Sequence, residues 1–473
     1  MPGSSRPIYA TWLQADTAVM NDKAERRWSS NLMFLAAAVG SAVGISNVWK
    51  FTYVAGENGG GAFVIIYVGA IVLIALPALI AEFLVGRRGG ASVVKTMDLL
   101  AQRDRIAPAW RYYGIMAALG AFIALSFYAV VAGWTIDYFY QAIAFGFSDI
   151  TAEQSTAAMA ELMASPARMI AGQSIFLGLT ALTVAAGVRR GLERVLRWLT
   201  PALFVILLVL LVYAFIAGDV RAGSAFLFVP DFSKLNTQTV LLAIGQAFFS
   251  LGIGLGVLLT IGSYMDRSSS IVRASIVVAA ADGSVALLAG LAIFPIVFEH
   301  GLSPAEGPGL IFATLPVAFG QMPAGNWLAP MFFVLMAVAA LTSAITILET
   351  VVAAIEDYSG MPRRRIVLIV GFLLWAVGLG TVFSFNVLRG YYPLGFLPAF
   401  DQRTIFETLD YVVSNFMMPA GGMLIAMLAG WGLTSSTTAE ELAPFDGIWL
   451  QVWRALVRYI VPLAIAMVFI SNL

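Results

Sequence analysis

The first long apolar stretch of the chain is interrupted at its centre by Gly40-Ser41-Ala42-Val43-Gly44-Ile45-Ser46-Asn47. A later apolar stretch is interrupted in the same way by Ser250-Leu251-Gly252-Ile253-Gly254-Leu255-Gly256. Glycine is common where transmembrane helices pack closely, so either stretch alone could serve packing only. Interrupted spans in corresponding positions of two halves of a chain, however, are the best sequence indication of a transporter binding site. The positions of the two stretches among the membrane spans therefore decide the fold.

The composition excludes a water-soluble protein. Of 473 residues, 60% are hydrophobic and 11% are charged, whereas about a quarter of the residues of a soluble domain are charged. A helix needs about 20 apolar residues to cross the hydrocarbon core of a bilayer. Hydropathy read between the charged loops predicts eleven spans, near residues 31–57, 61–87, 112–141, 168–187, 195–217, 238–264, 272–299, 327–355, 366–386, 406–433 and 450–471.

The two interrupted spans are the first and the sixth of this series. Because they lie five helices apart, they run in opposite directions, which predicts two halves related by an axis in the membrane plane. The predicted fold is an all-α integral membrane protein with a five-plus-five inverted repeat and broken helices 1 and 6. Its expected segments are an amino-terminal tail at 1–27, the first repeat at 28–217, the second repeat at 218–433, and a cytoplasmic loop with helix 11 at 434–473.

Loop charges predict the orientation. Basic residues gather in the 2/3, 4/5 and 8/9 loops: Arg87, Arg88, Lys95, Arg103, Arg105, Arg111, Arg189, Arg190, Arg194, Arg197, Arg363, Arg364 and Arg365. By the positive-inside rule these loops face the cytoplasm. The chain is therefore expected to be a multi-pass protein of the plasma (inner) membrane, with a cytoplasmic amino terminus and an external carboxyl terminus.

The 10/11 loop does not follow this charge pattern. It is acidic at Glu440, Glu441 and Asp446. Basic residues return only at Arg454 and Arg458, which could snorkel at the start of the last span.

The residue inventory argues against several other classes of protein. Lys plus Arg and Asp plus Glu each number 27, so the net charge gives no reason to expect nucleic acid as a partner. The chain has no cysteine and one histidine, His300, which is expected at the membrane interface. This inventory does not favour a zinc site or an enzyme.

The breaks themselves indicate what binds. Backbone amides and carbonyls at a break lack helical partners and need partners other than lipid. A cation and a carboxylate-bearing ligand would supply them. Neutral oxygen ligands of the type that an alkali ion prefers lie in these spans at Asn47, Ser250, Thr342 and Ser343.

Three carboxylates within predicted spans bear on function. Asp282 is placed deep in the seventh span, where an ionised carboxylate needs a cation and indicates function. A protonated or solvated Asp282 in a water-filled crevice is the alternative. Glu82 and Glu349 lie nearer span ends and are expected to hydrogen-bond neighbouring backbone.

Several motifs resemble those of the neurotransmitter:sodium symporter family. They are Trp28-Ser29-Ser30, Gly40 to Gly44, Asn47-Val48-Trp49-Lys50-Phe51, Glu57 to Phe63, Gln246 to Ser250, Leu341-Thr342-Ser343 and Asp410. The resemblance runs from about residue 28 to the end, and the eleven-helix form is similar to that of bacterial members. It implies a sodium-coupled symporter of a neutral, hydrophobic or aromatic amino acid, working by alternating access. A non-transporting amino-acid receptor of the same fold and a symporter of a related small zwitterion remain alternatives.

The resemblance also implies two sodium ions. One would be bound by the Ala42 carbonyl, Asn47, Ser250, Asp282 and the substrate carboxylate. The second would be bound by the carbonyls of Gly40, Val43 and Ala339 and the hydroxyls of Thr342 and Ser343. Chloride is not expected to be required, because chloride-dependent members have a serine where this chain has Ala286 and Asp282 would supply the negative charge.

The substrate site implied by the resemblance lies between the broken helices. The substrate carboxylate would meet the amides of Ile45 and Ser46 and the Tyr128 hydroxyl, and the amine would face the carbonyls of Ala42, Phe249 and Ser250. The side-chain pocket would be lined by Ala124, Tyr128, Phe249, Gly252, Leu255, Ser343 and Ile347.

Two gates follow from the same resemblance. Lys50 and Asp410 would form the outer ion pair, and the inner gate would consist of Arg26 or Arg27 with Asp357, Trp28 and Tyr264. The chain departs from the family pattern at three positions: Lys50 replaces arginine, Thr52 replaces proline and Ser46 replaces glycine.

Overall fold

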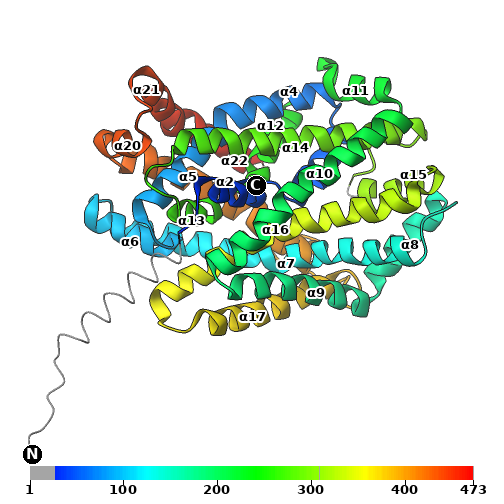
Figure 1. Cartoon of the computed structure of the whole chain (residues 1–473), viewed down its shortest axis with the longest axis horizontal. Helices are drawn as coiled ribbons and strands as arrows, with labels where there is room; N and C mark the ends of the chain where they lie inside the picture. The colour runs from blue at the N-terminus through cyan, green and yellow to red at the C-terminus, as the bar shows by residue number, and fades with distance from the viewer. Residues whose placement is uncertain (1–26, 308, 472–473) are drawn as a thin grey trace, which may run out of the picture.

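The regular structure of the chain is helical. The computed structural model describes residues 27–307 and 309–471, and in these ranges the one isolated β-bridge joins Gly60 to Pro230. Long helices run lengthwise through the molecule and α10 crosses them, while α6, α20 and α21 lie at one end and α8, α11 and α15 at the other (Figure 1). The predicted all-α fold is confirmed.

Ten of the eleven predicted spans are found in the described residues as helices that could cross a membrane, when the bent first pair is counted as one span. In the described ranges, nine continuous helical segments are long and apolar enough to cross a membrane: Gly61–Gly89, Pro108–Ala144, Pro166–Ala185, Val188–Ala217, Ile271–Glu299, Gly325–Ser359, Arg363–Ser384, Ile405–Gly432 and Gly447–Ser471. The first predicted span is the pair Asn31–Ala42 and Ser46–Glu57, bent by 49°. The sixth is broken more completely, into α12 (Thr237–Ser250) and α13 (Val257–Ser263).

Several spans combine two α-helices through a π-helical turn. The first span consists of α2 (Asn31–Ala42), a π turn at Ser46–Lys50 and α3 (Phe51–Glu57). The remaining spans contain α4 (Gly61–Ala70), α5 (Leu76–Gly89), α7 (Arg111–Ala144), α9 (Pro166–Ala185), α10 (Arg194–Ala217), α14 (Ile271–Glu299), α16 (Gly325–Ser359), α17 (Arg363–Ser384), α18 (Ile405–Tyr411), α19 (Met418–Met427), α21 (Gly447–Ala455) and α22 (Val461–Ser471).

Connections that read as loops also contain helices. These are α6 (Val93–Arg103), α8 (Ala152–Ala164), α11 (Val220–Phe228), α15 (Leu315–Gln321) and α20 (Ser435–Leu442). In α6 the buried residues include Val93, Met97 and Leu100, at the spacing of one helix face. Such helices are too short to cross a bilayer, so a hydropathy search for spans does not find them.

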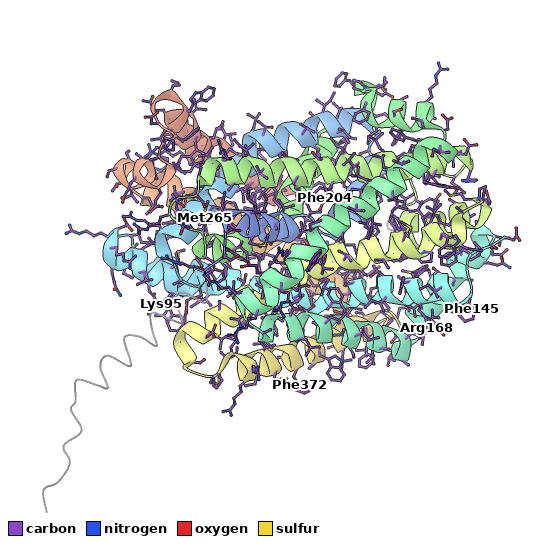
Figure 2. The ribbon with its side chains drawn as sticks, viewed as in Figure 1. Lys95, Phe145, Arg168, Phe204, Met265 and Phe372 are labelled. Atoms are coloured by element: carbon purple, nitrogen blue, oxygen red, sulfur yellow. The ribbon has the colours of Figure 1, made fainter. Side chains whose placement is uncertain are left out.

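The outer surface is apolar along several spans. Phe372 of α17 and Phe145 after α7 are 64% and 78% exposed and point away from the bundle (Figure 2). On the inside, α7 and α9 approach closely at Gly133 and Gly172, where an added Cβ on Gly172 would lie 2.6 Å from the Gly133 carbonyl oxygen. Small residues between spans and large apolar residues outside are what a bilayer requires.

The acidic 10/11 loop is explained by ion pairs. The Arg87 guanidinium donates to Glu441 at 2.9 Å, and Arg88 pairs with Glu440 at 2.9 Å. The 10/11 loop therefore lies on the same side of the bundle as the 2/3 loop. The expectation that Arg454 snorkels is wrong: it is buried, and its guanidinium donates to the Thr438 hydroxyl at 2.7 Å.

Candidate functional site

The break in the first span is held by side chains. Helix α2 ends at Ala42, and Val43 is extended, with φ −74° and ψ 104°. The amide of Gly44 donates to Asn47 Oδ1 at 2.9 Å. Beyond the break, the Thr52 hydroxyl donates to the carbonyls of Val48 and Trp49 at 2.7 and 2.9 Å. Hydroxyl bonds of this kind to the preceding turn favour a bend in a helix.

The break in the sixth span is held by backbone conformation. Gly252, Gly254 and Gly256 have φ values of +64°, +99° and +67°, a region that side chains disfavour. An added Cβ on Gly254 would lie 2.2 Å from the Met418 carbonyl oxygen, so α19 is packed directly against the break. The Gly254 amide donates to Glu82 Oε1 at 2.8 Å, as predicted for a carboxylate that bonds neighbouring backbone.

A buried polar cluster joins the two breaks. The Asn47 amide nitrogen donates to Asp282 Oδ1 at 2.7 Å and to Ser250 Oγ at 2.9 Å. The Ser250 hydroxyl lies 2.8 Å from both carboxylate oxygens of Asp282. Asn47 and Asp282 are fully buried. Among the described residues, no Lys or Arg forms an ion pair with Asp282. A buried carboxylate without a basic partner, next to a hydroxyl and a side-chain amide, fits a cation such as Na⁺.

A second oxygen cluster lies where α2 meets α16. The Thr342 hydroxyl donates to the Ala339 carbonyl at 3.0 Å, and the Ser343 hydroxyl donates to the Ser41 carbonyl at 3.1 Å. Gly40 faces this cluster, because an added Cβ there would lie 3.5 Å from the Thr342 Cβ. Of the set predicted for a second sodium ion, the Thr342 and Ser343 hydroxyls both lie next to the Ala339 carbonyl.

A cavity of about 90 Å³ lies between the breaks. All the predicted substrate residues except Ile45 line it: Ala42, Ser46, Ala124, Tyr128, Phe249, Ser250, Gly252, Leu255, Ser343 and Ile347. None of its lining residues is charged. Gly252 has a positive φ and also open space around its Cβ direction, so it serves both the break and the cavity volume.

Sequence reasoning missed part of the cavity wall. Phe127, Val257, Val413 and Met418 also line it. Val413 and Met418 lie in the tenth span, where Asp410 was the one residue singled out.

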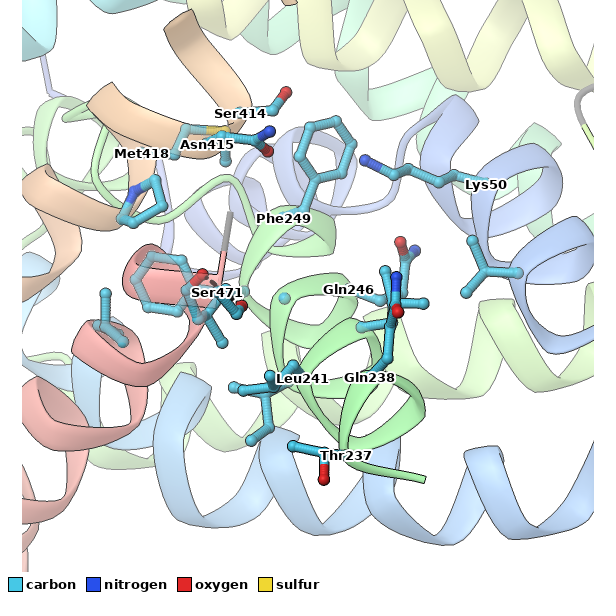
Figure 3. Close-up of a pocket in the computed structure, with 18 residues that line it drawn as sticks. Lys50, Thr237, Gln238, Leu241, Gln246, Phe249, Ser414, Asn415, Met418 and Ser471 are labelled. Carbon is cyan, nitrogen blue, oxygen red and sulfur yellow. Dashed lines mark hydrogen bonds between the residues drawn. The ribbon is translucent and has the colours of Figure 1, made fainter. Parts of the chain in front are cut away.

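The predicted outer ion pair is not formed. Among the described residues, Lys50 and Asp410 make no ion pair, and the Lys50 ammonium lies 3.7 Å from the centre of the Phe249 ring. Figure 3 shows Phe249 between Lys50 on one side and Asn415 and Met418 on the other. Asp410 instead accepts from the Ser414 hydroxyl at 2.7 Å. A cation on an aromatic face is an attractive contact that sequence reading did not consider.

The inner-gate residues lie in two groups. The Trp28 indole donates to the Ile261 carbonyl at 3.3 Å and packs edge-on against Tyr264. The Tyr264 hydroxyl donates to Glu349 at 2.8 Å, and Glu349 pairs with Arg363. The expectation that Glu349 bonds only backbone is therefore wrong. The sequence of span eight alone does not predict this ion pair, because Arg363 belongs to the 8/9 loop.

The remaining predicted inner-gate residues are Arg26, Arg27 and Asp357. Arg26 lies outside the described residues, and Asp357 accepts from the Ser92 amide at 2.9 Å. The pKa of Asp266 is below its ordinary value, first because the Ser268 hydroxyl and amide donate to it and also because Arg27 lies nearby. The structure thus places Arg27 near Asp266.

This combination of features defines a class. The described residues form up to ten candidate membrane spans, and the first and sixth predicted spans are broken. Together with an uncharged cavity between the breaks and a buried carboxylate beside it, these are the features of a secondary transporter.

Comparison with known proteins gives the family. The model of the sodium:neurotransmitter symporter family matches residues 25–164 and 147–473, and the chain belongs to this family. It is 36% identical to the uncharacterised sodium-dependent transporter YhdH of Bacillus subtilis, over 96% of this chain and 98% of that protein. It is 30% identical to an uncharacterised sodium-dependent transporter of Haemophilus influenzae, over 96% of this chain and 99% of that protein.

A solved structure matches over nearly the whole chain. The crystal structure of MhsT in complex with L-phenylalanine is 38% identical in sequence, covers 94% of this chain and 99% of its own, and superimposes with a TM-score of 0.85. The resemblance inferred from the first-helix motifs is confirmed, and the chain is a sodium-dependent membrane transporter and not an enzyme.

Proposed function

We propose that the chain imports a neutral, hydrophobic or aromatic amino acid together with sodium by alternating access. The observation that carries this proposal is the uncharged cavity next to the buried Asn47, Ser250 and Asp282 cluster. An amino-acid carboxylate in that cavity could complete the oxygen shell of a sodium ion. Each ligand would then raise the affinity for the other by the same factor, which couples their transport.

The class of side chain follows from the cavity wall. Ala124, Leu255, Ile347 and Val413 offer apolar contacts and no charge, which favours a hydrophobic or aromatic side chain and disfavours a charged one. The phenylalanine bound to the similar MhsT supports this choice. The second oxygen cluster at Thr342 and Ser343 supports two sodium ions for each substrate.

The proposed membrane is the plasma (inner) membrane, with the amino terminus in the cytoplasm and the carboxyl terminus outside. The basic 2/3, 4/5 and 8/9 loops support this orientation. The ion pairs of Arg87 and Arg88 with Glu441 and Glu440 support a cytoplasmic 10/11 loop. The boundaries of the two repeats, 28–217 and 218–433, remain a prediction.

Uptake into proteoliposomes tests the proposal. Radiolabelled phenylalanine or leucine should accumulate when an inward sodium gradient is imposed, and replacing Na⁺ with K⁺ or choline should abolish accumulation. Equal uptake in K⁺ without a pH gradient would overturn sodium symport.

Counterflow separates a transporter from a receptor of the same fold. Vesicles preloaded with unlabelled amino acid should take up labelled amino acid transiently in the presence of Na⁺. Sodium-dependent binding without counterflow would indicate the receptor.

A further inference from the structure

Two cavities meet at a shared wall. The inner cavity of about 90 Å³ lies between the breaks. An outer cavity of about 380 Å³ lies between the first, sixth, tenth and eleventh spans. Two residues line both cavities, Phe249 and Met418. Phe249 and Met418 therefore form the partition between the spaces. Figure 3 shows both residues in the wall of the larger cavity.

The side chains of Phe249 and Met418 differ in conformational freedom. Phe249 is a rigid ring whose face is covered by the Lys50 ammonium at 3.7 Å. Met418 has an unbranched side chain with three rotatable bonds and a polarisable sulfur, which adapts to irregular space. Its outer side faces the larger cavity. Of the two, Met418 is the side chain that can yield.

The backbone of Met418 cannot move away with its side chain. An added Cβ on Gly254 would lie 2.2 Å from the Met418 carbonyl oxygen, and one on Gly421 would lie 2.1 Å from the Gly254 carbonyl oxygen. Helix α19 is thereby packed onto the break in the sixth span. Any adjustment at this wall has to occur in the methionine side chain.

We propose that Met418 is a specificity-determining residue of the amino-acid site, a movable wall that yields toward the outer cavity when a large substrate side chain enters the inner one. This inference rests on the proposed function. A small substrate leaves Met418 packed inward against it, and a large one displaces the thioether outward. The range of accepted side chains is then set by a residue of the tenth span, in addition to the residues of the broken helices.

Equilibrium binding to the full-length protein in Na⁺ tests this wall. Met418→Ile keeps an apolar side chain of similar size but makes it stiff at χ1. We expect the Kd for Trp to rise by roughly tenfold or more relative to that for Ala, since about one methylene of mismatch has effects of this order in an apolar pocket. The matched control is Met417→Ile, because Met417 is a buried neighbour that lines neither cavity. It should leave the Trp to Ala ratio unchanged.

Chemical rescue supplies a second measurement. The chain has no cysteine, so Met418→Cys introduces a single thiol. Because the cysteine side chain is shorter than that of methionine, we expect this variant to bind Trp more tightly relative to Ala. Methyl methanethiosulfonate transfers a methylthio group to that thiol and releases methanesulfinate. The product, –CH2–S–S–CH3, has the length and the unbranched shape of methionine and should restore the wild-type ratio.

The outcomes distinguish a failure of the proposed function from a failure of the movable wall. If the wild-type protein binds no amino acid in Na⁺, the proposed function and this inference both fail. If it binds them, the movable wall is overturned by Met418→Ile raising the Kd of Trp and Ala equally, by Met417→Ile giving the same shift in ratio, or by methylthiolation leaving the Met418→Cys ratio unchanged.

Discussion

The two breaks meet at one site but are built by different means. In the first span, side chains hold the break: Asn47 accepts from the Gly44 amide, and Thr52 bonds two carbonyls beyond it. In the sixth span, the backbone holds the break through glycines with positive φ and through contact between Gly254 and Met418.

Because the two breaks are held differently, we expect substitutions in them to have different effects on stability and on ligand affinity. A break that is held by side chains leaves their other polar atoms free for further hydrogen bonds, as the Asn47 amide nitrogen donates to Asp282. A break that is held by backbone conformation presents amides and carbonyls, and an added methyl group strains the backbone there. Substitutions in the sixth break should therefore act mainly on stability, and substitutions around the first should act mainly on ligand affinity.

The largest effect is expected for Gly254→Ala. Its φ of +99° and the 2.2 Å approach of an added Cβ to the Met418 carbonyl combine backbone strain with a clash against backbone. We expect the free energy of unfolding to fall by about 3 kcal/mol or more, as for overpacking together with strain. Thermal unfolding of the purified protein measures the loss.

Gly252→Ala is the matched control for this experiment. Its φ of +64° is also positive, but nothing lies within 4 Å of its Cβ direction. Only the cost of the left-handed conformation applies, about 1–2 kcal/mol. Equal melting temperatures for the two variants would show that contact with α19 does not hold the break.

The same contrast explains what could be predicted from the sequence. The breaks and the spans were predictable because glycine runs and hydropathy are local signals. The contact between Lys50 and Phe249 and the pairing of Glu349 with Arg363 were not, because they depend on how separate helices pack. Met418 was missed for the same reason, since an apolar residue in an apolar span carries no signal of its own.

Asp282→Asn tests the side-chain half of the comparison. Asparagine can keep hydrogen bonds to Asn47 and Ser250 but removes the negative charge that a sodium ion would meet. Loss of one partner of a buried charge pair costs about 2–5 kcal/mol, so we expect the sodium concentration for half-maximal binding to rise about 30-fold or more. Binding of a fixed amino acid across a sodium titration measures it.

Glu82→Gln is the control for Asp282→Asn, because it also neutralises a buried carboxylate but lies outside the proposed sodium site. Glu82 is equally buried, but it accepts from the Gly254 amide in the sixth break. Glu82→Gln should lower the melting temperature and leave the sodium concentration for half-maximal binding unchanged. A sodium shift as large as that of Asp282→Asn would contradict the assignment of the charge to Asp282.

Ala124→Val probes the cavity between the breaks. Ala124 lines the cavity, so added bulk should penalise large substrates. One methylene of mismatch is worth about 1–3 kcal/mol, and we expect the Kd of Trp or Phe to rise about tenfold while that of Ala or Gly changes little. Equal losses for all amino acids would remove Ala124 from the side-chain site.

Tyr128→Phe should act on every substrate alike. The Tyr128 hydroxyl is buried in the cavity wall, and among the described residues no group lies in hydrogen-bonding geometry to it. This suits a group that meets the carboxylate common to all amino acids. A hydrogen bond contributes about 0.5–1.5 kcal/mol, so each Kd should rise about two- to tenfold. A loss confined to aromatic substrates would mean that the ring contacts the side chain and the hydroxyl does not contact the carboxylate.

The smallest expected effect is that of chloride. Asp282 lies within the cluster that joins the two breaks, where its ionised carboxylate would supply a negative charge. Ala286, one turn further along α14, is buried and offers no hydroxyl. A second anion beside Asp282 would add repulsion in a site of low dielectric. Replacing chloride with gluconate should therefore leave sodium-driven uptake unchanged. The informative contrast is Asp282→Asn, in which the fixed charge is gone: any recovery of its uptake by added chloride would show that one negative charge is what the site needs. If the wild-type protein loses uptake in gluconate, Asp282 does not supply this charge. The negative charge next to the first break would then come from a bound anion.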